Sequence, residues 1–167
     1  MKKLRFLLPL CALCLLFSCK KNSSSTGSSG SITATVDGSS QTFNYSATAS
    51  LLAFGGSQAL TITGVQSSSL TTYVITLIIT PTSGNVTAGT YSATTAHDNV
   101  QLTYAQASTS VAYQNDPTSG SSNASVTISS ISSTHVKGTF TGKLILESGS
   151  GAATKTVTNG SFDLDIK

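Results

Sequence analysis

Residues 136–146 read VKGTFTGKLIL, and polar and apolar side chains alternate along most of this stretch. The apolar phase consists of Val136, Phe140, Leu144 and Leu146, with glycines between them, and the other phase carries lysines and threonines. Alternation with a period of two is typical of a strand that buries one face. The stretch therefore predicts a half-buried antiparallel strand.

The last segment, residues 155–167, repeats this pattern. It places Phe162, Leu164 and Ile166 on an inward phase, and Asp163, Asp165 and Lys167 on an outward one. We expect the two segments to belong to the same kind of half-buried sheet.

Working outward, shorter alternating or β-branched runs predict the remaining strands, over residues 32–36, 41–50, 59–65, 73–80, 89–94, 100–105, 110–114 and 124–131. Residues 37–40 (DGSS) form a turn signal after the first run. In the second run, Phe43 and Tyr45 are expected on one face, and in the short fifth run Tyr91 is expected inward. Residues 73–80 are almost continuously apolar, which is typical of a central strand or of one covered on both sides.

About ten strands at regular spacing, with no stretch suited to a helix of normal length, predict an all-β domain over residues 32–167. The expected fold is an antiparallel β-sandwich. A closed or partly open lipocalin-like β-barrel is the alternative.

The first residues of the sequence predict a secretory leader. Residues 1–5 are basic, and residues 6–17 are almost wholly apolar but too short to cross a bilayer as a helix. Residues 16–19 (LFSC) resemble the lipobox of bacterial lipoproteins. That resemblance implies a signal peptide over residues 1–18 and acylation of Cys19 with chains such as palmitate. Two or more acyl chains anchor a protein stably.

We then expect residues 19–31 to comprise the lipidated cysteine and a Ser/Gly-rich flexible tether. Lys20 follows the cysteine where retention in the inner membrane usually calls for Asp, so we expect the outer membrane. Cys11 and Cys14 leave with the leader, and the mature domain has no disulfide. The net charge of +3 comes from the leader, and no basic patch remains elsewhere, which argues against nucleic-acid binding.

Four short motifs within the domain, VDG at 36–38, GTY at 89–91, VKGTFTG at 136–142 and TNGSFD at 158–163, occur in an order that is similar to a family of small Bacteroidetes lipoproteins and secreted proteins of unknown function. The resemblance implies an all-β extracytoplasmic domain on a lipid tether. It implies no activity and no functional residues.

Groups able to carry out acid–base chemistry are few. The two histidines, His97 beside Asp98 and His135 at the start of a strand, are far apart in the sequence and lie next to polar turns. We expect no catalytic residue and no zinc site from them. Asp163 and Asp165 are expected to lie on a solvated strand face, and Glu147 at a strand end.

Asn115, Asp116 and Asn123 flank one polar loop and offer oxygen ligands to calcium, although a single carboxylate is few for that ion. We therefore expect no metal and no cofactor. Tyr104 and Tyr113 are the aromatic residues most suited to an edge where a sugar could stack, and core packing is the other interpretation.

These observations favour a non-catalytic envelope protein that binds a protein or glycan partner or serves structurally. A carrier with a barrel cavity and, less favoured, a small hydrolase are the alternatives.

Overall fold

The computed structural model describes residues 30–68, 71–93, 98–116, 123–147 and 153–167. These residues form strands and connections and contain no helix. Nothing in the described ranges is a helix long and apolar enough to cross a membrane. The strands are β1 (Gly30–Val36), β2 (Ser39–Phe43), β3 (Ser46–Phe54), β4 (Ser57–Ser67), β5 (Thr72–Pro81), β6 (Gly89–Ser92), β7 (Asp98–Gln106), β8 (Val111–Gln114), β9 (Asn123–Ile131), β10 (His135–Leu146) and β11 (Thr154–Asp165).

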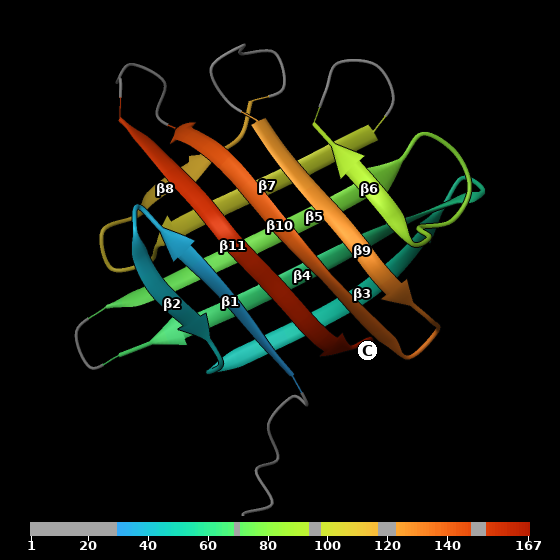
Figure 1. Cartoon of the computed structure of the whole chain (residues 1–167), viewed down its shortest axis with the longest axis horizontal. Helices are drawn as coiled ribbons and strands as arrows, with labels where there is room; N and C mark the ends of the chain where they lie inside the picture. Colours follow the sequence, from blue (N-terminus) through green and yellow to red (C-terminus); the bar gives the residue numbers. More distant parts are fainter. Residues whose placement is uncertain (1–29, 69–70, 94–97, 117–122, 148–152) are drawn as a thin grey trace, which may run out of the picture.

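The strands form one continuous antiparallel sheet in the order β2-β1-β11-β10-β8-β7-β5-β4-β3, with β9 paired to β10 and β6 to β9. The sheet folds over itself, so that β1, β9, β10 and β11 cross in front of β3, β4, β5 and β7 (Figure 1). The long strand β10 joins the two layers. It pairs with β9 over most of its length, while Ile145 and Leu146 pair with β8, which continues into β7.

The other side of the fold nearly closes. The chain passes from β2 to β3, and β3 meets the end of the chain through a parallel bridge between Ala49 and Ile166. The Lys167 N–H donates to the Ala49 carbonyl at 2.9 Å. The predicted all-β antiparallel fold is confirmed, in the form of a two-layered sheet that is almost closed into a barrel.

One predicted strand, residues 41–50, is wrong because it is two strands. Phe43 ends β2 with its side chain fully buried, whereas Tyr45 is 75% exposed. The two therefore do not share a face. Tyr45 donates its N–H to the Val65 carbonyl at 3.0 Å, at the point where the chain leaves one layer for the other. The change of layer interrupts the alternation at Asn44.

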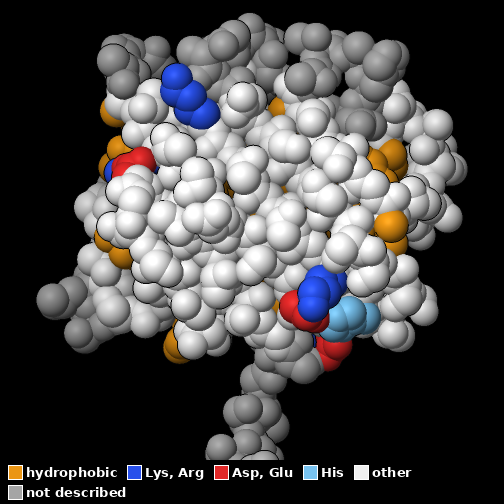
Figure 2. Space-filling model, viewed as in Figure 1, with side chains coloured by type: hydrophobic (Ala, Val, Ile, Leu, Met, Phe, Trp, Pro, Cys, Tyr) orange, Lys and Arg blue, Asp and Glu red, His pale blue; other side chains and the backbone are white. Residues whose placement is uncertain are grey.

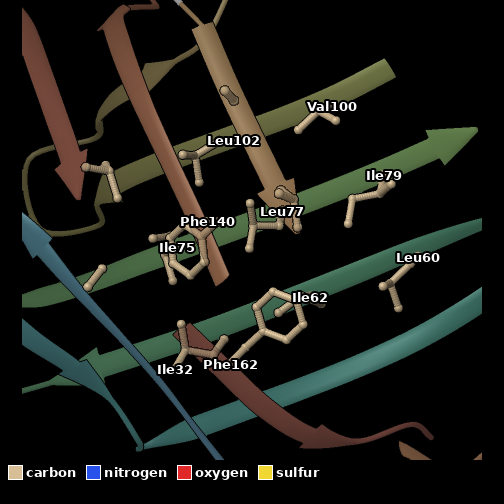
Figure 3. Close-up of a cluster of buried hydrophobic side chains, with 14 of the residues drawn as sticks. Ile32, Leu60, Ile62, Ile75, Leu77, Ile79, Val100, Leu102, Phe140 and Phe162 are labelled. Carbon is tan, nitrogen blue, oxygen red and sulfur yellow. The ribbon is translucent and has the colours of Figure 1, made fainter. Parts of the chain in front are cut away.

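The inward phases predicted for the two C-terminal segments are confirmed for their central residues. Phe140 and Phe162 are fully buried and stack at 6.4 Å between ring centroids. Figure 3 shows them facing the aliphatic side chains of the opposite layer. The predicted central strand, β5, lies between β4 and β7, and Tyr91 is buried as expected. The fully buried side chains also include Ile32, Phe43, Leu60, Ile62, Ile75, Leu77, Ile79, Leu102, Ile128 and Leu144.

Candidate ligand-binding site

A cavity of about 420 Å³ opens between the two layers at the end of the sheet where β1 and β7 finish and β8 and β11 begin. Its wall combines aromatic, amide and paired charged groups. We call it the tyrosine pocket and define it by Tyr73, Tyr104, Tyr113, Asp37, Gln41 and Lys155. Ser39, Gln106 and Thr109 add further polar groups to its lining.

The three tyrosines come from three neighbouring strands and share one face. Tyr104 on β7 is directly opposite Ile75 on β5 and Tyr113 on β8, and Tyr73 is two residues before Ile75. Side chains two residues apart on a strand point the same way. The core-facing side of these strands therefore carries aliphatic residues in the middle of the sheet and tyrosines near the pocket. A tyrosine can bury its ring in the core while its hydroxyl points toward the pocket.

The rings and their hydroxyls are held in place by neighbours. Tyr73 and Tyr104 stack with centroids 5.6 Å apart and ring planes 12° apart. The amide of Gln41, from the opposite layer, lies 3.0 Å (Nε2) and 3.2 Å (Oε1) from the Tyr104 hydroxyl, close enough to donate and to accept. Burial raises the pKa of the Tyr104 phenol, which stays neutral at physiological pH. Tyr104 is buried, while Tyr73 and Tyr113 are half-buried.

An ion pair forms the rim. The Lys155 ammonium donates to Asp37 Oδ2 at 2.7 Å, and the Thr156 N–H donates to Asp37 Oδ1 at 2.8 Å. Asp37 and Gly38 both have positive φ, as a two-residue hairpin turn of the primed kind requires. The turn predicted over residues 37–40 is therefore confirmed at 37–38, while Ser39 and Ser40 already belong to β2. The Lys155 ammonium also lies 5.5 Å from the centroid of the Tyr113 ring, within range of a cation–π interaction.

The ion pair at the rim keeps both of its partners, Asp37 and Lys155, in their charged forms. The hydrogen bond from Lys155, followed by that from Thr156, holds the pKa of Asp37 below its ordinary value, and the bond to Asp37 raises the pKa of Lys155. Near neutral pH the carboxylate is therefore ionised, the ammonium is charged and the Tyr104 phenol is protonated. None of the three is tuned to exchange a proton in that range, and the set suits hydrogen bonding to a ligand.

A second polar cluster lies on the outer face of β10 and β11, at the other end of these strands. His135 Nε2 lies 2.7 Å from Asp163 Oδ1, His135 Nδ1 lies 3.1 Å from Asp165 Oδ1, and Lys137 donates to Asp163 Oδ2 at 3.0 Å. Figure 2 shows histidine, lysine and acidic side chains gathered there on a face that otherwise has few charges. We call this group the histidine cluster.

Sequence reasoning placed Asp163 and Asp165 on an exposed face, which is confirmed, but it missed His135 as their partner. The antiparallel register, which pairs His135 with Asp165, brings them together. The hydrogen bond to Asp165, and then the one to Asp163, raises the pKa of His135. With a carboxylate at each ring nitrogen, the imidazolium is favoured, whereas a general base needs a free lone pair on the ring.

The predicted calcium candidates are only partly described. Asn115 is buried, and its side-chain amide hydrogen-bonds the backbone of β7. Its Oδ1 accepts from the Leu102 N–H at 2.6 Å, and its Nδ2 donates to the Val100 carbonyl at 2.9 Å. Asn123 begins β9, Asp116 follows Asn115, and residues 117–122 lie outside the described ranges. Within the described ranges no three His, Cys, Asp or Glu side chains are grouped to hold a metal.

The remaining candidate residues fall elsewhere. Cys19, Cys11, Cys14 and His97 lie outside the described residues, and Asp98 begins β7. Glu147 follows β10 and donates its N–H to the Ala112 carbonyl at 2.9 Å. A larger open groove of about 860 Å³ lies at the opposite end of the fold from the tyrosine pocket. It is lined by apolar residues such as Leu51, Val86, Ile131 and Ile166, by uncharged polar groups and by Lys167.

The comparisons with known proteins add no assignment to this geometry. No family model, curated protein or solved structure matches the chain. The site is therefore interpreted from its own residues.

Proposed function

We propose that the chain is a non-catalytic, lipid-anchored binding protein of the bacterial cell envelope that holds its ligand in the tyrosine pocket. The leader, the lipobox ending at Cys19 and the Ser/Gly-rich segment that follows support anchoring, and Lys20 supports the outer membrane. The partner class is a small molecule or glycan. The membrane is contacted through the lipid.

The position of the tyrosine pocket carries this proposal. The tether joins the domain at Gly30, the first residue of β1, and the pocket lies at the last residue, Val36, and the turn that follows. A strand rises about 3.3 Å per residue, so seven residues separate the two ends of β1 by roughly 20 Å. A pocket at the end away from the tether is open to ligands while the lipid stays in the membrane.

The alternatives receive less support from the site. The inner faces of the two layers are packed with Phe43, Phe140 and Phe162, which favours a surface site over the interior of a carrier. The pKa directions in the tyrosine pocket favour binding over a hydrolase, because Asp37, Tyr104 and Lys155 are each held in one protonation state near neutral pH. At His135 a carboxylate lies at each ring nitrogen, an arrangement that does not suit a general base.

The test is a ligand screen followed by nuclear magnetic resonance. We expect amide shifts that cluster on residues around Gln41, Tyr104 and Lys155 when fractions of small polar envelope molecules are added to the protein. Shifts confined to residues of the groove around Leu51 and Ile131 would contradict the assignment of the site. Turnover of any added compound that depends on His135 would contradict the non-catalytic part of the proposal.

A further inference from the structure

We infer that the ligand of the tyrosine pocket is a neutral saccharide, an inference that rests on the proposed function and names the ligand class for the same site. Three features of the pocket carry it: its aromatic surface, its balance of hydrogen-bond donors and acceptors, and its lack of net charge.

The aromatic surface suits the C–H face of a sugar ring. Tyr73 and Tyr113 are half-buried at the opening, and Tyr104 supports Tyr73 from beneath by stacking. A ring face carries partial negative charge and attracts polarised C–H groups, as it attracts the Lys155 ammonium beside Tyr113. Because the rings are braced by neighbours, a ligand that stacks on them meets a surface that is already ordered.

The hydrogen-bonding groups match a ligand rich in hydroxyls. A hydroxyl donates once and accepts from two directions, so it is best bound by side chains that offer both roles. The lining supplies amides and hydroxyls from both layers of the sheet: Gln41, Gln106, Ser39 and Thr109. Asp37 and Lys155 add one charged acceptor and one charged donor, whose hydrogen bonds to hydroxyls are stronger than neutral ones.

The charge balance favours a neutral ligand over a strongly ionic one. Lys155 and Asp37 are the two charged side chains among the residues that line the pocket, and they neutralise each other at 2.7 Å. An anionic ligand would meet the Asp37 carboxylate, and a cationic one the Lys155 ammonium. The volume of about 420 Å³ lies in the usual range for small-ligand sites, roughly 300–1,000 Å³, and suits a monosaccharide or disaccharide unit of a glycan.

The experiment uses the full-length processed protein in a zwitterionic detergent without a sugar head group, because a glycosidic detergent would compete for the site. The chain has five tyrosines and no tryptophan, so its fluorescence comes from tyrosine, and three of the five tyrosines line the pocket. The probes are neutral disaccharides built from glucose, galactose, mannose or N-acetylglucosamine. Galacturonate serves as the anionic probe and p-cresol as an aromatic probe without sugar hydroxyls.

The expected result is saturable binding of at least one neutral saccharide, weaker binding of galacturonate, and loss of about tenfold in affinity in Tyr113→Ala, as the loss of one stacking contact implies. Tyr113→Phe keeps the ring face and should stay within about threefold of wild type. Tyr45→Ala is the matched control, since Tyr45 is 75% exposed and lies outside the pocket. Melting temperatures of all variants show whether each is folded.

Three outcomes would overturn the inference. Saccharide binding that Tyr45→Ala weakens as much as Tyr113→Ala would place the sugar elsewhere. Binding of p-cresol or galacturonate at the pocket without any neutral saccharide would replace the ligand class and leave the proposed function in place. Failure of every probe class and of the envelope fractions to perturb the pocket tyrosines would overturn both.

Discussion

The ring of Phe162 lies against Gly138, its partner across the ladder between β10 and β11. The relationship is repeated two residues along each strand, where the ring of Phe140 lies against Gly160. Each phenylalanine fills the space that the missing side chain of the opposite glycine leaves, and the two rings stack on each other. The glycines are therefore part of the core packing, although they carry no side chain.

Gly160→Ala should destabilise the domain by about 1–3 kcal/mol, the usual range for overpacking a filled core. A methyl group at this position would lie 2.6 Å from ring carbons of Phe140 and 2.5 Å from the Phe140 carbonyl oxygen. Urea unfolding of a soluble form spanning residues 20–167 measures the change, with the exposed Thr139→Ala as control. Equal stability of Gly160→Ala and wild type would show that the ring is free to move aside.

Phe140→Ala and Phe162→Ala should each cost about 3–5 kcal/mol of unfolding free energy, as deletion of a buried ring usually does. The same urea experiment decides the matter. Tyr45→Ala removes an exposed ring and should change stability by less than about 0.5 kcal/mol. A loss under about 1 kcal/mol for either phenylalanine would contradict the burial of that ring between the two layers.

Asn115→Ala should destabilise the domain by about 1–3 kcal/mol for each backbone group left unpaired, because the amide satisfies both the Leu102 N–H and the Val100 carbonyl in a buried position. Calcium should not restore the melting temperature of this variant, and neither calcium nor EDTA should move that of the wild type. A rise of several degrees in the wild type with calcium would instead identify a calcium site, and Asp116 would be the first residue to replace.

The histidine cluster should make stability depend on pH. The pKa of His135 is raised above 6.5 in the folded state, so its contribution is complete below pH 6.5 and is lost as the pH rises through the folded pKa. The pKa of Asp163 is lowered from 3.8, mainly by Lys137 and then by His135, so its contribution is present above pH 3.8 and is lost as the pH falls through the folded pKa.

We therefore expect His135→Gln to remove part of the fall in melting temperature on the alkaline side, measured from about pH 5 to 9. His97→Gln, which replaces the other histidine, is the control. Because the cluster is exposed, the effect should shrink in high salt. Identical pH profiles for His135→Gln and wild type would show that the ion pairs do not persist in solution.

Cys19→Ser should abolish lipid attachment, because the thiol is the acceptor that the lipobox provides. Metabolic labelling with a clickable fatty-acid analogue, followed by capture of the protein, measures the modification. Ser18→Ala keeps the thiol and should still be labelled. Equal labelling of Cys19→Ser and wild type would contradict the lipoprotein assignment.

The nearly continuous apolar run at residues 73–80 was enough to predict the central position of β5. The alternation of side chains elsewhere was enough to predict the all-β antiparallel fold and the buried phase of β10 and β11. These features depend on spacing at i and i+2, which a single strand carries by itself. Alternation could not show that residues 41–50 are divided between β2 and β3, because the break occurs where the chain changes layer at Asn44, an event set by the packing of the two layers.

The sequence predicted only part of the candidate site. Tyr104 and Tyr113 were candidates for an edge, but Tyr73, Gln41 and the Asp37–Lys155 pair were not connected with them. The sequence by itself determined the strand character and the scarcity of charged groups, and it predicts the leader and the lipidation site. The tertiary structure alone decided which polar groups meet, because pairing register joins residues as distant as Asp37 and Lys155, and local side-chain periodicity contains no information about the register between distant strands.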